Sequence, residues 1–318
     1  MSPLHITNGD AAAEQIRAAG LGDDVLPWRD VLHEGPVPPP ATLDSLRPLR
    51  VRFLAGQGWG NPVEIAVEFE RRDRALGAAA ASEDVVLWFE HDLYDQLQLA
   101  QILDWYAGAG VDGASRLSLI QVQDYLGPMN PSRVAALFET RKPVSQAQLA
   151  AAQVAWRAFS SPDPRAIERV RPELDVLPFM AAALTRQLQE FPSVSNGLSR
   201  IEQQTLEGLT DGPLSVKQLF AAAHLAREKV IYLGDAVFVR LLSRVAQGRS
   251  ALVRVDGDLQ GWPWSSTVEI TDIGRAVMEG RADRIKTLGI DRWLGGVHLR
   301  GHSVPWRWDT EAERMVAS

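Results

Sequence analysis

The sequence predicts an α/β fold: a mostly parallel sheet with flanking helices, followed by a helical bridge and a winged-helix-like domain. Three observations carry this prediction. Apolar strand-like segments alternate with helical segments over residues 1–130, residues 131–192 show only helical patterning, and residues 193–318 begin with three helices and a hairpin. Alternating strands and helices are typical of a parallel sheet that is covered on both faces.

The first 130 residues contain clear start and stop signals. Asn8-Gly9-Asp10 is a turn in which Asp10 is a suitable N-cap, Pro48 should break a helix, and Asn61-Pro62 should begin one. The run Val85-Val86-Leu87-Trp88-Phe89 is typical of a buried strand. We expect strands at residues 4–7, 25–28, 85–89 and 116–122, and helices at 11–19, 43–54, 61–80 and 94–106.

The later part of the chain carries helix caps and a hairpin. Ser145 should cap a helix of the bridge, and Ser199-Arg200-Ile201-Glu202 has the pattern of a capping box. Ser215 should cap a second helix of the last domain, and a third follows at 235–245. Residues 251–255 and 267–271 should then pair as a hairpin, which completes the order typical of a winged helix.

Composition excludes several classes of protein. The chain of 318 residues has 46% hydrophobic residues and no cysteine, so it can bury sizeable cores but holds no disulfide, thiolate nucleophile or zinc–thiolate site. The N-terminus lacks a basic segment followed by an apolar run, and no apolar stretch approaches the length of a membrane span. We therefore expect a cytoplasmic bacterial protein with no membrane partner.

Charge is distributed unevenly. Residues 1–130 carry 9 Arg and no Lys against 19 Asp plus Glu, which argues against contact with a nucleic-acid backbone. Residues 198–286 carry 12 basic and 11 acidic groups, and the helix at 235–245 is mostly apolar apart from Arg240 and Arg244. DNA-reading helices are usually more polar and basic. This balance favours a protein-interaction or structural role for the winged-helix-like domain, with DNA as the weaker alternative.

Polar and ionisable residues follow the predicted strands of the first domain. The carboxyl ends of parallel strands meet at one edge of a sheet, where open α/β sheets bind their ligands. We therefore expect one common cavity there. The candidate catalytic residues are His91, Glu90, Asp92 and His33, and the candidate ligand-binding residues are His5, Asn8, Gly9, Asp10, Arg29, Asp30 and Asp95.

The segment around His91 allows three interpretations. A histidine oriented by Glu90 or Asp92 would transfer protons near neutral pH. The same group, with Asp95, would also suit a divalent metal such as magnesium, manganese or zinc. Alternatively, Asp92 caps the following helix and the other side chains are solvated. The sequence contains no HExxH motif and leaves these interpretations open.

The two other polar segments also have a functional and a structural interpretation. In Asn8-Gly9-Asp10, the glycine would let a ligand approach the backbone and the helix N-terminus would attract an anion, or the segment is a tight turn with a cap. Arg29 would hold a phosphate or carboxylate, or it would brace its loop by pairing with Asp30 or Glu34. There is neither a GxGxxG motif nor a GxxxxGK[ST] motif.

Several of these motifs together resemble an uncharacterised bacterial family, domain of unknown function number eighteen thirty-five. The resemblance covers roughly residues 3–125 and rests on three N-terminal segments. The C-terminal segments Trp293-Leu294-Gly295-Gly296 and Pro305-Trp306-Arg307-Trp308 are similar to the end of longer members. Membership implies no activity that could be transferred. The N-terminal segments are His5-Ile6-Thr7-Asn8-Gly9-Asp10, Trp28-Arg29-Asp30 with His33-Glu34-Gly35-Pro36, and Glu90-His91-Asp92 with Asp95-Gln96.

The sequence therefore predicts a pocket that binds a small polar or phosphorylated metabolite or nucleotide, with acid–base or metal-assisted chemistry as one option. In this hypothesis His91 carries the proton, Arg29 holds an anion, and Asn8 with Gly9 lines the pocket. The competing hypothesis is a ligand-sensing regulator that is not an enzyme and whose winged helix contacts DNA or a protein. A third is a purely structural partnership.

Overall fold

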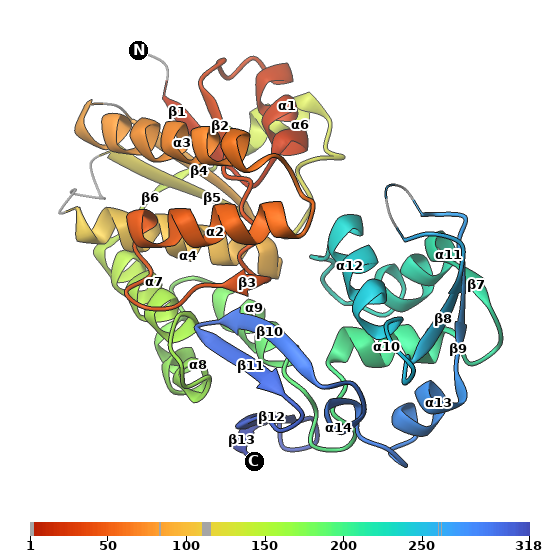
Figure 1. Cartoon of the computed structure of the whole chain (residues 1–318). Helices are drawn as coiled ribbons and strands as arrows, with labels where there is room; N and C mark the ends of the chain where they lie inside the picture. The colour runs from red at the N-terminus through yellow and green to blue at the C-terminus, as the bar shows by residue number, and fades with distance from the viewer. Residues whose placement is uncertain (1–2, 83, 110–115, 260, 262) are drawn as a thin grey trace. The chain divides into compact units, whose positions relative to one another are not determined.

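The computed structural model describes residues 3–82, 84–109, 116–259, 261 and 263–318, and the chain divides into two compact units (Figure 1). Unit 1 comprises residues 1–185 and 295–297, and unit 2 comprises residues 186–294 and 298–318. Among the described residues, no helix combines the length and the apolar character that a membrane span requires.

Unit 1 contains a five-stranded sheet with the order β2-β1-β4-β5-β6. β1 pairs in parallel with β2 and β4, β4 pairs in parallel with β5, and β6 is antiparallel to β5. The mostly parallel sheet is thus confirmed, and residues 131–192 contain a short strand besides the expected helices. The strands are β1 (Leu4–Thr7), β2 (Val25–Pro27), β4 (Val85–Glu90), β5 (Leu117–Val122) and β6 (Lys142–Pro143).

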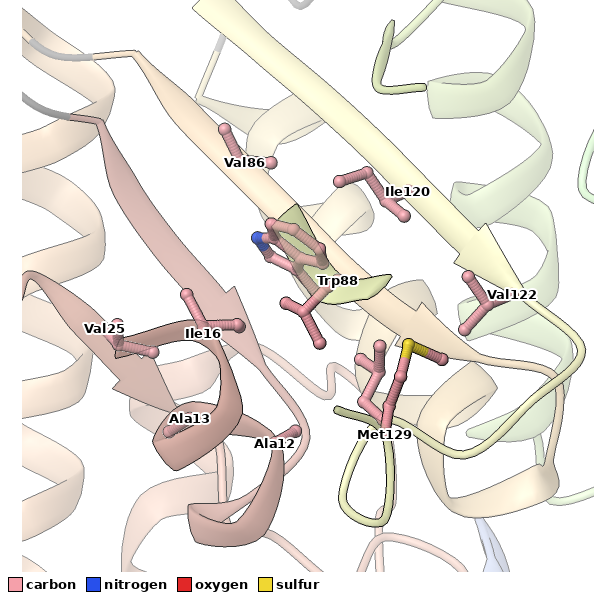
Figure 2. Close-up of a cluster of buried hydrophobic side chains, with 11 residues drawn as sticks. Ala12, Ala13, Ile16, Val25, Val86, Trp88, Ile120, Val122 and Met129 are labelled. Atoms are coloured by element: carbon pink, nitrogen blue, oxygen red, sulfur yellow. The ribbon is translucent and has the colours of Figure 1, made fainter. Parts of the chain in front are cut away.

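One face of the sheet packs against two helices, α1 (Asp10–Ala18) and α6 (Pro131–Phe138). Because side chains alternate along a strand, Val86 and Trp88 of β4 point to this face together. Figure 2 shows them in one buried apolar cluster with side chains of α1, β2 and β5. All six residues of β4 are buried, as expected for a strand covered on both faces.

The chain leaves β4 through a short turn into α4 (Leu93–Gly108), which packs against α7 (Gln146–Phe159). α2 (Leu43–Gly56) and α3 (Pro62–Ser82) pack against each other. The expected break at Pro48 is wrong, because α2 continues through it. The helix packs through a buried face that extends on both sides of the proline and is formed by Leu46, Arg50 and Leu54.

Two further segments of unit 1 are the short helix α8 (Arg165–Val170) and the glycine pair Gly295-Gly296. A Cβ atom on Gly295 would overlap the backbone oxygen of Phe159, and one on Gly296 would overlap that of Ser160. Glycine is required here because the backbone approaches the end of α7 too closely for any side chain.

Unit 2 contains short helices and a three-stranded antiparallel sheet with the order β7-β9-β8. The predicted hairpin is present as β8 and β9, and the predicted caps at Ser199 and Ser215 are confirmed. These elements are α10 (Arg200–Gly208), β7 (Leu214–Ser215), α11 (Val216–Phe220), a π-helical turn (Ala221–Leu225), α12 (Asp235–Val245), β8 (Val253–Asp256), β9 (Thr267–Ile270) and α13 (Asp272–Met278).

Residues of two further helices and four further strands also belong to unit 2. β12 and β13 pair antiparallel, and Trp308 of β12 is buried. Trp293 stacks on His298 with ring centroids 4.5 Å apart, so this tryptophan is engaged within the chain. The elements are α9 (Met180–Leu188), which contains the boundary between the units, α14 (Arg284–Leu288), β10 (Ile290–Gly295), β11 (Val297–Gly301), β12 (Trp306–Asp309) and β13 (Arg314–Ala317).

Candidate functional site

Three carboxyl groups come together at the carboxyl end of β4, and we call Glu90, Asp92 and Asp95 the acidic cluster. One carboxylate oxygen of each lies within 4.8 Å of the others. All three side chains are buried, with residue exposures of 4%, 4% and 0%. The sequence produces this arrangement because a fully buried strand runs directly into a helix whose N-cap and first turn are acidic.

Neutral N–H groups donate hydrogen bonds to each of the three carboxyl groups of the cluster. Asp92 Oδ1 accepts from the backbone N–H of Asp95 at 3.0 Å, and Asp95 Oδ1 accepts from the N–H of Glu90 at 2.6 Å. Asn8 Nδ2 donates to Asp95 Oδ2 at 2.7 Å, and the N–H of Leu126 donates to Glu90 Oε1 at 2.7 Å. Among the described residues, the hydrogen bonds to this cluster come from amides and not from arginine or lysine.

Burial raises the pKa of all three carboxyl groups. For Glu90, desolvation outweighs the hydrogen bonds from Leu126 and Asn8 and raises the pKa to about 7. For Asp92, desolvation and the nearby charge of Glu90 raise the pKa to about 7. The pKa of Asp95 also rises well above its usual range, against the effect of its N–H donors. Such interacting groups titrate as one unit, and burial moves their titration from the acidic range towards neutral pH.

Asn8 and Tyr94 connect the acidic cluster to His33. The hydroxyl of Tyr94 donates to the backbone oxygen of Asn8 at 3.3 Å. The ring of Tyr94 meets the buried ring of His33 edge-to-face, with centroids 6.0 Å apart. Burial raises the pKa of Tyr94, so its hydroxyl is a neutral donor. The sequence prediction named Asn8 and His33 but missed Tyr94, which lies between Asp92 and Asp95 in the first turn of α4.

Arg29 and Asp10 form a separate, partly exposed ion pair. Arg29 Nη2 lies 2.6 Å from Asp10 Oδ1, and Arg29 Nη1 lies 3.0 Å from Glu68 Oε1. The hydrogen bond from Arg29 lowers the pKa of Asp10. Gly9 occupies the N-cap position of α1, so the expected cap at Asp10 is wrong and Asp10 begins the helix. With φ at 46°, Arg29 has a left-handed backbone, and its N–H reaches the oxygen of Asn8 at 3.3 Å.

Asp30 belongs to a buried brace. Its Oδ1 accepts from Arg50 Nε at 3.0 Å and from Arg50 Nη2 at 2.7 Å, and both side chains are 1% exposed. Arg50 also donates to the backbone oxygens of Glu34 and Val31, at 2.7 and 2.9 Å. Arg50 of α2 therefore stabilises this loop, and nothing in the local sequence indicates that role. Asp30 Oδ2 is buried and has no hydrogen bond within the described part of the chain.

His5 lies in the core of unit 1. It pairs with Val86 in the sheet, four positions before Glu90. Its Nδ1 accepts from Trp88 Nε1 at 2.9 Å, which leaves Nε2 to donate to the backbone oxygen of Leu21 at 3.2 Å. Desolvation lowers the pKa of His5, so the imidazole is neutral and its tautomer is fixed.

His91 follows β4 directly and is half-buried. Its ring lies 5.5 Å from that of Tyr125 and 5.9 Å from that of Phe179, measured between centroids. Desolvation lowers its pKa. Within the described ranges, Nδ1 of His91 is buried without a hydrogen bond, and none joins His91 to the acidic cluster. The structure therefore places a neutral histidine beside the cluster, among aromatic rings.

The structure thus brings Asn8, Glu90, Asp92 and Asp95 together, with His33 next to them through Tyr94, and gives Asp10, Arg29, Asp30 and His5 other partners. No known family model matches the chain, and no curated protein matches it either.

Proposed function

We propose that the carboxyl edge of the sheet in unit 1 binds a small polar ligand and that the acidic cluster exchanges a proton with it. One observation carries this proposal: three carboxyl groups are buried together, and their hydrogen-bond donors are neutral amides. Ionising all three at once would bury like charges against each other, so at least one proton is retained at neutral pH. A carboxyl group with a pKa near 7 is suited to general acid–base catalysis.

The hydrogen bonds indicate which group carries the proton. Both oxygens of Asp95 accept short N–H bonds, at 2.6 and 2.7 Å, and such donors stabilise the ionised form. Burial also raises the pKa of Asp95, but only Asp95 has such donors on both oxygens, so we assign the negative charge to Asp95 and the proton to Glu90 or Asp92. Asn8 acts as a positioning residue because it fixes Asp95 from the neighbouring strand.

Charge also narrows the class of ligand. A phosphate would meet the acidic cluster, and the guanidinium of Arg29 already pairs with Asp10 and Glu68. We therefore favour a polar ligand without net negative charge, carrying hydroxyl or amine groups, over a phosphorylated one. The left-handed backbone of Arg29 is consistent with a functional edge, because strained residues gather at binding sites.

A divalent cation is the alternative occupant of the acidic cluster. Carboxylate and amide oxygens suit Mg²⁺ and Ca²⁺. One carboxylate oxygen of each residue lies within 4.8 Å of the others, which is close enough for one cation to contact all three. Glu90, Asp92 and Asp95 would be the ligands, and the bound cation would supply positive charge that attracts an anionic group of the substrate.

The test combines a pH titration with a ligand screen on the full chain. We expect ¹³C carboxyl shifts to show a group in the cluster that titrates near pH 7, which either Glu90→Gln or Asp92→Asn removes. Neutral polyols, amino acids and nucleosides are then screened by thermal shift at pH 7, with Asp95→Asn as the site variant and the exposed Glu139→Gln as its control. Carboxyl groups that all titrate below about pH 5, together with no stabilisation that depends on Asp95, would overturn the proposal. Saturable binding of Ca²⁺ or Mg²⁺ would establish the alternative.

We also propose a second candidate function. In this proposal residues 198–286 form a winged-helix-like domain, and the chain acts as a ligand-sensing regulator. The order α10, α11 and α12, followed by the β8–β9 hairpin that β7 joins, supports this candidate. Membership of residues 3–125 in domain of unknown function number eighteen thirty-five stays a proposal too and adds no activity.

A further inference from the structure

We infer that Asn8 is a site of spontaneous modification, at which the side-chain amide is hydrolysed and the acidic cluster gains a further carboxyl group. Asn8 is followed by Gly9, and the pair lies between β1 and α1. Glycine has no side chain to shield its own backbone nitrogen, so that nitrogen can readily attack a preceding asparagine. Of the four asparagines in the chain, Asn8 and Asn196 precede glycine, whereas Asn61 and Asn130 precede proline, which has no N–H.

The reaction needs only the chain and water. The backbone nitrogen of Gly9 attacks Cγ of Asn8, and a C–N bond forms. The bond from Cγ to Nδ2 breaks, and Nδ2 leaves as ammonia with the proton that Gly9 loses. Water then opens the resulting cyclic imide at either of its carbonyl groups. Opening at one gives aspartate, and opening at the other gives isoaspartate, in which the main chain runs through the side-chain carbon.

The structure leaves the attacking nitrogen of this pair unengaged. Asn8 and Gly9 are both partly exposed. Gly9 is the N-cap of α1, and within the described part of the chain its backbone N–H donates no hydrogen bond. A capping box cannot hold it, because the third residue of the helix is Ala12. The backbone oxygen of Asn8 accepts from the N–H of Arg29 and the hydroxyl of Tyr94, but both bonds are 3.3 Å long and restrain the peptide group only weakly.

The second Asn-Gly pair, Asn196-Gly197, is held in place. Asn196 is 5% exposed, its Oδ1 accepts from the N–H of Leu198 at 3.1 Å, and its Nδ2 donates to Gln203 Oε1 at 2.9 Å. The backbone N–H of Gly197 donates to the backbone oxygen of Ser193 at 3.1 Å, so the attacking nitrogen is engaged. Reaction at Asn196 therefore has to wait for local opening of the fold, whereas reaction at the first pair does not.

The modification acts directly on the acidic cluster. Nδ2 of Asn8, the atom that is lost, donates the 2.7 Å hydrogen bond to Asp95 Oδ2. A carboxyl group in its place either repels an ionised Asp95 or retains a further proton, and both effects raise the pKa of the cluster. Isoaspartate also lengthens the main chain between β1 and α1. The cluster thus loses a donor as the protein ages, whether or not the site binds a ligand.

The test is peptide mapping by mass spectrometry of the full chain during incubation at pH 8, once folded and once unfolded in guanidinium chloride. In the folded chain we expect Asn8 to convert to aspartate and isoaspartate. Conversion of Asn196 should be at least roughly tenfold slower, because it depends on local opening. In the unfolded chain Asn8 and Asn196 should convert at similar rates. Asn61 and Asn130 should stay intact in both samples.

Matched glycine variants test the attacking nitrogen. Gly9 has an extended backbone, and no other atom lies within 4 Å of the position of a Cβ there, so Gly9→Ala should fold normally and slow the conversion of Asn8 strongly. Gly234→Ala makes the same change at the N-cap of α12, where the Cβ position is equally open, and should leave that conversion unchanged. Melting temperatures establish that both variants fold, and the comparison of folded with unfolded parent chain decides the matter if Gly9→Ala does not.

Three results would overturn the inference. The first is an Asn8 that stays intact in the folded chain for as long as the unfolded chain needs to convert. The second is an equal rate at Asn8 and Asn196 in the folded chain. The third is an unchanged rate at Asn8 in a folded Gly9→Ala variant.

Discussion

Asn8 Nδ2 donates a hydrogen bond of 2.7 Å to Asp95 Oδ2, although the two residues are 87 positions apart in the chain. The register of the sheet produces this contact, because Thr7 pairs with Trp88 and the two strands run in the same direction. Asn8 thus leaves β1 beside the turn that leads from β4 into α4. The candidate site is therefore assembled by strand pairing and not by any local motif.

Removing the amide of Asn8 should destabilise the protein more at high pH than at low pH. Asn8→Ala leaves a buried, ionised Asp95 oxygen without its donor, which costs about 1–3 kcal/mol. A protonated cluster has less need of that donor, so we expect the loss to shrink between pH 8 and pH 5. Urea denaturation at both pH values measures it, and an equal loss at the two values would contradict the assignment of the charge to Asp95.

The raised pKa of Glu90 links folding stability to pH. Between the unfolded pKa of 4.5 and the folded pKa of about 7, the folded state binds more protons than the unfolded state. The free energy of unfolding should therefore fall as pH rises through this window. Glu90→Gln should remove part of that slope and stabilise the protein at pH 8 by about 1–3 kcal/mol. Glu139→Gln serves as the control and should leave the slope intact, and a parent chain whose stability rises from pH 5 to 7 would count against the raised pKa.

Arg50 should be far more important for stability than an exposed arginine. Arg50→Leu leaves Asp30 charged and buried and removes the donors to the loop backbone, at a cost of about 3–5 kcal/mol. The control is Arg133→Leu, whose partner Asp124 is largely exposed, and it should cost at most about 1 kcal/mol. Chemical denaturation compares the two variants. Similar costs would show that the buried pair does not brace the loop.

His91 can be tested by separating its ring from its nitrogens. His91→Phe keeps an aromatic ring beside Tyr125 and Phe179 and should change the stability by no more than about 1 kcal/mol. If His91 carries a proton for the ligand, this variant should lose any ligand-induced thermal shift. Retained ligand binding in His91→Phe, with a lower melting temperature in His91→Ala, would assign His91 to packing alone.

Binding of generic duplex DNA by the full chain should be weak. The near-neutral segment 198–286 offers few phosphate contacts, so we expect a Kd no tighter than roughly 10⁻⁴–10⁻⁶ M at physiological salt. A mobility-shift titration measures it. Nanomolar, sequence-dependent binding would instead support a DNA-binding regulator.

Hydrophobic patterning was sufficient to predict the parallel sheet. β4 is recognisable because five consecutive apolar residues precede a helix start, and the strand–helix order implies the shared carboxyl edge. The same reasoning predicts that this edge carries Asn8, Glu90, Asp92 and Asp95. What it could not supply was the identity of buried partners. In the sequence, Arg50 cannot be distinguished from other polar residues of an amphipathic helix. Its contacts with the loop arise only when α2 packs beside that loop.

Two other features also depended on tertiary structure. The helix through Pro48 persists because packing of its apolar face outweighs one missing hydrogen bond, a balance that local propensity does not contain. The sequence predicts His5 among the residues of the sheet edge, because it lies at a predicted strand and near acidic groups. Strand alternation directs it instead towards Trp88, where its two nitrogens are satisfied in the core.

The short strand β6 determines how the sheet of unit 1 ends. It is the outermost strand on its side of the sheet (Figure 1). Its two residues, Lys142 and Pro143, are both exposed. An incoming strand would meet a proline that has no N–H to donate and a charged lysine side chain. Both features discourage strand addition at a sheet edge. This side of the sheet is therefore protected against edge-to-edge aggregation and against capture of extended peptides.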